Sequence, residues 1–144
     1  MTAKAIPDGY HTVTPYIVVS GAAGLIDFTK QAFDAHERSR KTNPDGTVMH
    51  AEVQIGDSVL MIADASDAFA AMPAMIHLYV ADVDAAYKSA LGAGAESMRK
   101  PADQPYGDRS AGVKDTWGNQ WWVATHIEDM SEDEMARRVA AAYP

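Results

Sequence analysis

The chain has 144 residues, 47% hydrophobic and 22% charged, and this size and balance predict one soluble domain spanning residues 1–144. The net charge of −8 opposes contact with phosphate backbones, so we expect no nucleic-acid partner. The chain has no cysteine, which excludes disulfides and thiolate metal ligands and favours a cytoplasmic location. No apolar run reaches the roughly 20 residues of a membrane span, and no secretory signal is evident near the start, so we expect no membrane partner.

The first half of the sequence predicts a strand, a helix and a β-hairpin. β-Branched and aromatic residues mark the first strand, and Ser20 is placed to cap the helix that follows. Apolar and polar residues then alternate with the period of a half-buried strand as far as the turn at Gly56-Asp57. The expected elements are a strand at Thr12–Val19, a helix ending near Ala35, a turn at Asn43–Gly46, and strands at Met49–Ile55 and Ser58–Ala63.

The second half repeats this order after a linker rich in Ala and Met. Asp82 is placed to cap a helix, and Ser131 with Glu134 has the form of a capping box for a final short helix. The expected elements are a strand at Ile76–Ala81, a helix from Asp82 to about Leu91, a Pro-rich loop at Pro101–Pro105, strands at Ser110–Lys114 and Gln120–Thr125, and a helix at Glu134–Ala142.

The two halves align as an internal repeat. Val19 matches Val80, 61 residues later, and Gly56 matches Gly118, 62 residues later. An additional strand near residues 37–40 and another near residues 95–99 would make each half a βαβββ module. The predicted organisation is a first module at 12–64, a linker at 65–75, a second module at 76–126 and a C-terminal helix within 127–144.

Four stretches of sequence carry a family resemblance. TPYIVVSGAAGLIDFTKQAF, MHAEVQIGDSVLMIAD, HLYVADVDAAY and YGDRSAGVKDTWGNQWWVATH, in this order, resemble the vicinal oxygen chelate superfamily, which includes glyoxalase I, extradiol dioxygenases and bleomycin-resistance proteins. They look most like its PhnB-like branch. The resemblance implies an α+β fold in which two βαβββ modules form a curved mixed sheet around a cavity, with the helices outside.

Metal-dependent members of that superfamily place ligands on the first and last strand of each module. Carried over by position, the resemblance puts Thr14, Met75, Trp122 and either Leu60 or Met61 at those places. None of these side chains offers the carboxylate or imidazole group that a divalent metal site needs. We therefore expect no metal site of this kind and no cofactor.

Strand alternation separates a helix-facing side from an open, cavity-facing side. The adjacent Trp121 and Trp122 must point to opposite sides, Trp121 into the core and Trp122 into the cavity. The residues expected on the helix side are Ile17, Val19, Ala51, Val53, Ile55, Ile76, Leu78, Val80, Trp121 and Val123. The expected ligand-binding residues are Tyr16, His50, Glu52, His77, Tyr79, Trp122 and Arg109, a mixture of aromatic and polar groups typical of a ligand cavity.

Several of these residues also have a purely structural interpretation. His77 can be a hydrogen-bonded sheet histidine, and Trp122 can be ordinary packing. Arg109 can bind a ligand carboxylate, or it can lock Asp108 or Asp115 in place. The pattern alone does not separate these roles.

Three functions remain open, and the fold does not choose among them. One is a small-molecule-binding protein with an aromatic cavity, which sequesters a compound as bleomycin-resistance proteins do. The alternative is an enzyme of the lyase, isomerase or dioxygenase type that uses His50, Glu52 and His77. A third reading is an interaction domain whose own side chains fill the cavity. We also expect a homodimer, because closed twofold dimers are the commonest soluble assembly.

Overall fold

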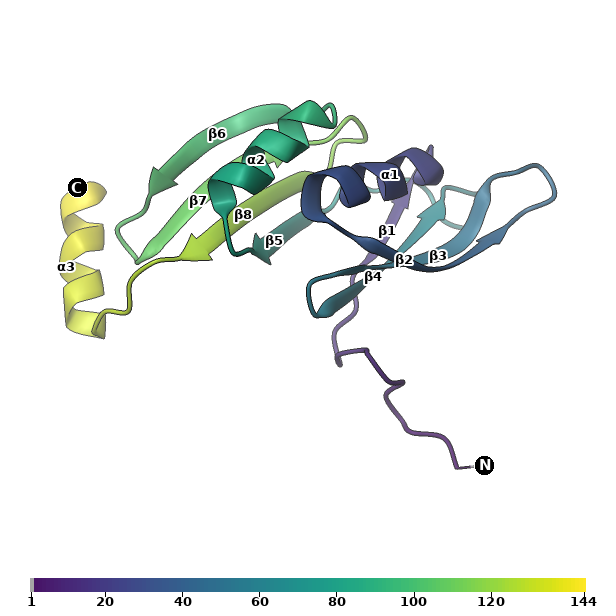
Figure 1. Cartoon of the computed structure of the whole chain (residues 1–144), viewed down its shortest axis with the longest axis horizontal. Helices are drawn as coiled ribbons and strands as arrows, with labels where there is room; N and C mark the ends of the chain where they lie inside the picture. The colour runs from purple at the N-terminus through teal and green to yellow at the C-terminus, as the bar shows by residue number, and fades with distance from the viewer. Residues whose placement is uncertain (1) are drawn as a thin grey trace. The chain divides into compact units, whose positions relative to one another are not determined.

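The computed structural model describes residues 2–144, which contain eight strands and three helices in two compact units, Met1–Ala74 and Met75–Pro144 (Figure 1). Each unit contains one four-stranded mixed sheet with a helix after its first strand. The predicted α+β class and the βαβββ order of both halves are confirmed, including the additional strand in each.

The sheet of the first unit has the strand order β1-β4-β3-β2. The β1 and β4 strands are parallel, and the other neighbours are antiparallel. Helix α1 follows β1 and packs on one side of this sheet (Figure 1). The elements are β1 at Tyr16–Val19, α1 at Ala22–Phe33, β2 at His36–Thr42, β3 at Val48–Ile55 and β4 at Ser58–Asp64.

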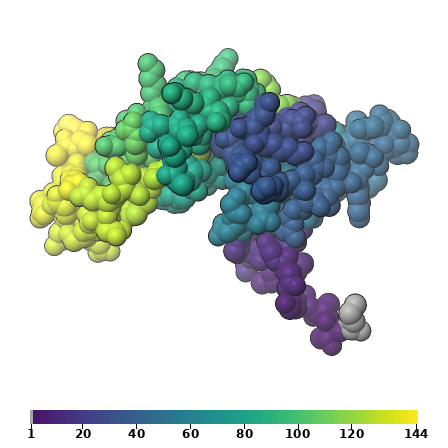
Figure 2. Space-filling view, in the orientation of Figure 1, coloured from purple at the N-terminus to yellow at the C-terminus, as the bar shows by residue number. Residues whose placement is uncertain are grey.

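The second unit repeats this topology with the order β5-β8-β7-β6 and then adds a terminal helix. Asp82 caps α2 through a hydrogen bond from the Ala85 N–H, and Ser131 caps α3 through one from the Glu134 N–H, as predicted. Helix α3 buries none of its residues and stands on the surface of this unit (yellow in Figure 2). The elements are β5 at Met75–Tyr79, α2 at Val83–Gly92, β6 at Glu96–Asp103, β7 at Asp108–Lys114, β8 at Gln120–His126 and α3 at Glu132–Ala142.

The core of each unit lies between its sheet and its helix, on the side that strand alternation predicts. In the first unit Ile17, Ala51 and Val53 are buried against α1, which contributes Leu25 and Ile26. In the second unit Trp121 and Val123 are fully buried, whereas the side chains on β5 that were assigned to the core are only half-buried.

Three local predictions were wrong, each for a physical reason. Strand β1 begins at Tyr16 and not at Thr12, since Pro15 has no N–H to donate to a neighbouring strand. Helix α1 is not capped by Ser20; its N-cap is Gly21, with φ of 100°, and has no side-chain cap. Strand β6 continues through Pro101, where a loop was expected, because the irregular pairing of this edge strand tolerates a missing donor.

None of the helices in the described part of the chain combines the length and apolar character that a membrane-spanning helix needs.

Candidate functional site

A chain of four polar side chains crosses the open side of the first sheet, opposite α1. The Tyr16 hydroxyl is 3.0 Å from Nδ1 of His50, and Nε2 of His50 is 3.1 Å from Glu52 Oε2. The other Glu52 oxygen accepts a hydrogen bond from the Tyr10 hydroxyl. His50 and Glu52 share a face because they lie two residues apart on β3, and Tyr16 reaches them from β1. Three predicted site residues are therefore in direct contact.

The electrostatics of this chain assign a role to each group. The hydrogen bond from Tyr10, followed by the one from His50, outweighs burial and holds the pKa of Glu52 below its usual value. The same Tyr10–Glu52 bond raises the pKa of Tyr10. Glu52 is therefore an acceptor-only carboxylate, and in the His50 tautomer whose Nε2–H donates to it, Nδ1 accepts from the Tyr16 hydroxyl.

A cavity of about 650 Å³ opens beside this chain, within the first unit. Tyr16 is the one predicted site residue that lines it. Its other walls come from the ends of β1, β3 and β4 and from the segment 65–72, which pairs with β1 through the Val18–Met72 bridge. The lining residues are Tyr16, Val18, Asn43, Val48, Met49, Ala63, Asp64, Ala65, Ser66, Ala68, Phe69 and Met72.

Asp64 anchors the structure around the cavity. Its Oδ1 accepts hydrogen bonds from the N–H groups of Gly21 and Ala22 at the start of α1, at 2.8 and 3.0 Å, and its Oδ2 accepts one from Val48 at 2.7 Å. Burial alone would raise the pKa of Asp64, but these three donors outweigh it and keep that pKa low. A carboxylate from β4 thus takes the capping role that was expected of Ser20.

In the second unit, Trp122 lies flat across the open side of the sheet. Its partner on β7 is Gly112, and a Cβ atom built there would lie only 2.4 Å from Cζ3 of the indole. The Trp122 Nε1 donates to Gln120 Oε1 at 3.1 Å, and the guanidinium carbon of Arg99 lies 4.9 Å from the ring centroid. Trp121 points the opposite way and donates to the buried Asp115 at 2.8 Å.

A second polar cluster occupies the same open side. The His77 and Tyr79 rings lie 4.9 Å apart, and the Tyr79 hydroxyl donates to Asp108 at 3.0 Å. Asp108 is only 5% exposed, and its other oxygen contacts His126 Nδ1 at 2.8 Å. The contact with Asp108, followed by the one with Asp129, raises the pKa of His126. His126 is the last residue of β8, and it is held between two carboxylates.

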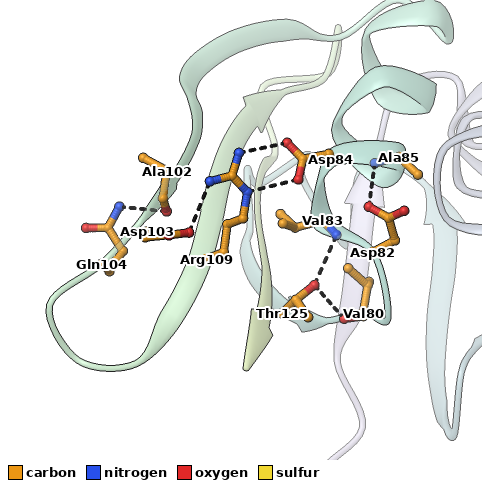
Figure 3. A network of polar contacts seen from close by, with 10 residues as sticks. All are labelled: Val80, Asp82, Val83, Asp84, Ala85, Ala102, Asp103, Gln104, Arg109 and Thr125. Carbon is orange, nitrogen blue, oxygen red and sulfur yellow. Dashed lines mark hydrogen bonds and ion pairs between the residues drawn. The ribbon is translucent and has the colours of Figure 1, made fainter. Parts of the chain in front are cut away.

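Arg109 lies elsewhere, on the helix side of the sheet (Figure 3). Its Nε and Nη2 donate to the two carboxylate oxygens of Asp84 on α2, and its Nη1 donates to Asp103 on β6. The structural partner expected for this side chain was Asp108 or Asp115, and both are engaged by other residues instead. Because β7 alternates, Arg109 and Ser110 point to opposite sides, and Arg109 joins helix to sheet away from Trp122.

The residues at the positions where metal-dependent members of the resembled superfamily hold a metal ion are not suited to bind one in this chain. Met61, which pairs with both Tyr16 and Glu52, stands at the first-module position, because the alternative, Leu60, is buried. A thioether at Met61 and an indole at Trp122 cannot replace the usual carboxylates. Within residues 2–144, no three His, Asp or Glu side chains gather closely enough to hold a metal ion.

Comparison with known proteins places the chain in a family. The family model for the Glyoxalase/Bleomycin resistance protein/Dioxygenase superfamily matches residues 10–123. The uncharacterized proteins Mb0911c of Mycobacterium bovis and Rv0887c of Mycobacterium tuberculosis are each 35% identical to the chain over 134 residues. These matches cover 85% of the chain in each case, with 88% and 79% of the respective relatives.

Solved structures share the fold at lower sequence identity. TioX from Micromonospora sp. ML1 matches with a TM-score of 0.69 and 22% identity, over 81% of this chain and 99% of that one. A glyoxalase/bleomycin resistance protein/dioxygenase from Nocardioides matches with a TM-score of 0.62 and 17% identity, over 90% of each chain. With the family model covering most of its length, the chain belongs to the Glyoxalase/Bleomycin resistance protein/Dioxygenase superfamily.

Proposed function

We propose that this protein binds a small, largely apolar organic molecule in the cavity of its first unit. The observation that carries the proposal is the cavity itself, whose 650 Å³ falls within the range of typical ligand sites. Most of its wall is apolar, and its few polar groups are ones that could orient a ligand, such as Asn43 and Ser66.

Three apolar side chains of the cavity wall are exposed to solvent, as expected for a site that receives an apolar ligand. Met49 is 53% exposed, Phe69 70% and Met72 69%. Covering them would contribute on the order of 4 kcal/mol, taking about 2 kcal/mol for each fully buried side chain. Phe69 also presents a ring against which an aromatic ligand can pack.

Tyr16 supplies the polar contact that would fix the ligand's orientation. Its hydroxyl lies at the junction between the cavity and His50, and the anionic Glu52 holds His50 from the other side. Because the Tyr16 hydroxyl donates to His50 Nδ1, its oxygen is left to accept a hydrogen bond from the ligand, and a ligand proton could pass through Tyr16 toward His50. We propose sequestration of the compound without a metal at the superfamily's usual positions, in the manner the resemblance to bleomycin-resistance proteins implies.

The experiment is mass spectrometry of small molecules that co-purify with the protein, followed by titration of the compound found. Phe69→Ala should weaken its binding while changing stability little, since the side chain is mostly exposed. Met98→Ala, at a residue 43% exposed in the second unit, is the matched control and should bind as the wild type does. Equal affinity of both variants and wild type would refute the assignment to this cavity.

The hydrogen-bonded chain favours a second candidate function, acid–base catalysis. Glu52 orients His50, and the Nδ1 atom of His50 is positioned to accept a proton, which is the arrangement of a general base and its orienting group. An isomerase or lyase acting on the bound molecule would use these residues. Turnover of the identified ligand that is lost in His50→Gln, with binding retained, would establish an enzyme; binding without turnover supports sequestration.

We further propose that the protein is a homodimer. Aromatic side chains on the open sides of both sheets remain uncovered within their own units, including Tyr16 at 48% exposed and Tyr79 at 67%. A twofold dimer is the commonest way for a soluble chain to cover such surface. Light scattering at tens of micromolar should give twice the monomer mass of 15.5 kDa; a monomer mass rejects the proposal.

A further inference from the structure

The open side of the second sheet carries a row of residues aligned across all four strands. Arg99 on β6 pairs with Gly112 on β7, Gly112 pairs with Trp122 on β8, and Trp122 pairs with His77 on β5. The Trp122 ring lies over Gly112, and the guanidinium of Arg99 lies over the Trp122 ring. Arg99 therefore places a positive charge at one end of the row, and Trp122 and His77 place aromatic rings along the rest of it.

Arg99 is held in place by two contacts. Its Nη2 donates to the Ser110 hydroxyl at 2.6 Å, and its guanidinium carbon is 4.9 Å from the Trp122 ring centroid. Trp122 is fixed in turn by its hydrogen bond to Gln120. An arginine stacked on an aromatic ring keeps the N–H donors at its edge available, so it can still bind an anion through two parallel hydrogen bonds.

The charge of Arg99 has no carboxylate to balance it, although the chain as a whole is acidic. No ion pair among residues 2–144 includes Arg99. Arg38, on the first sheet, acts on a carboxylate, since its charge helps to lower the pKa of Glu52. The arginines in ion pairs with Asp or Glu are Arg40, Arg109, Arg137 and Arg138.

We propose that this row is a binding site for a planar organic carboxylate, separate from the cavity of the first unit and independent of the function proposed for it. The carboxylate takes the guanidinium edge of Arg99, and the ring of the ligand extends along the row beside Trp122 and His77. The preference for an aromatic acid over a simple anion follows from the single cation and the aromatic surface beside it.

The probes are benzoate, its neutral isostere benzamide, and inorganic phosphate, titrated against the full chain while the Trp122 indole N–H resonance is followed by NMR. Benzoate should shift this resonance saturably at millimolar concentration. Benzamide should bind about tenfold more weakly or worse, because it lacks the charge that strengthens the hydrogen bonds. Phosphate should also be weaker, since it gains nothing from the aromatic surface.

The variants separate the charge of Arg99 from general electrostatics. Arg99→Gln should weaken benzoate binding by about tenfold or more, and Arg99→Lys should fall between this variant and wild type, because lysine keeps the charge but loses the paired donors. Arg137→Gln removes the same charge from an exposed site on α3 and is the control, expected to bind as wild type does.

Three results would overturn the proposal. They are equal binding of benzoate and benzamide, wild-type affinity in Arg99→Gln, and phosphate binding as tight as benzoate, which would indicate a simple oxyanion site. None of these variants alters the first unit, so a result that overturns this proposal does not affect the function proposed for the cavity.

Discussion

Replacing Gly112 with alanine tests the packing of Trp122 directly. A Cβ atom at this position would lie 2.4 Å from Cζ3 of the indole and 2.7 Å from Cε3 and Cη2. Carbon atoms pack at about 3.5–4.0 Å, so the ring has to move by about 1 Å or more. Such overpacking costs about 1–3 kcal/mol, and Gly→Ala returns about 0.4–1 kcal/mol by restricting the unfolded chain. Urea denaturation should show a net loss of about 1–2 kcal/mol.

A double-mutant cycle with Trp122→Ala isolates this clash from other effects of the substitution. Once the indole is gone, Gly112→Ala should be neutral or stabilising by up to about 1 kcal/mol, which gives a coupling energy of about 1–3 kcal/mol. The same free-energy cost in both backgrounds would mean that the new methyl group meets something other than Trp122, and the described packing of the ring would be wrong.

Further predictions concern the tryptophans, His126 and metals. Trp121→Ala should lower the free energy of unfolding by about 3–5 kcal/mol, because Trp121 is fully buried, whereas Trp122→Ala should cost less in the same urea titration. Asp108 and Asp129 raise the pKa of His126 above its usual value of 6.5. The stabilisation from charged His126 is therefore complete below pH 6.5 and is lost as the pH rises through the raised pKa. The melting temperatures of wild type and His126→Asn should differ more at acidic than at alkaline pH. Zinc, nickel and manganese should leave the melting temperature unchanged. A metal ion that did bind, at a concentration of 100 times its dissociation constant, would add about 2.7 kcal/mol to the free energy of unfolding. A stoichiometric metal in the native protein would contradict this prediction.

Local sequence patterns predicted those parts of the fold that depend on local periodicity. The opposite orientation of Trp121 and Trp122 follows from the two-residue repeat of a strand, and so does the shared face of His50 and Glu52. The cap at Asp82 was predictable because its partner N–H lies three residues along the chain. In each case the interaction spans a few residues and the geometry of one element fixes it.

Long-range contacts account for what the sequence did not reveal. Asp64 caps α1 from 42 and 43 residues away, and no local signal identifies such a partner. The cavity depends on segment 65–72 folding back to pair with β1, yet in the sequence this segment looks like a plain linker. Its exposed Phe69 was the available clue, since a large ring in a linker needs a surface to pack on. Arg99 gave no signal, because its stacking on Trp122 depends on the register of three strands.

The two sheets differ at equivalent positions in a way that sterics and charge explain together. Strand pairing makes Met61 the counterpart of Trp122. Met61 pairs with Tyr16, and Trp122 pairs with His77. Tyr16 and His77 are 61 residues apart in the sequence, and so are Met61 and Trp122.

On the neighbouring strand, Glu52 pairs with Met61 and Gly112 pairs with Trp122. The indole covers Gly112 so closely that no side chain fits there, whereas the narrower Met61 leaves room for a glutamate. A tryptophan at 122 therefore excludes a carboxylate at 112, the place from which one could neutralise Arg99. The size of this one side chain thus explains why the first sheet carries a carboxylate, Glu52, at this place, whereas the second sheet leaves Arg99 without one there.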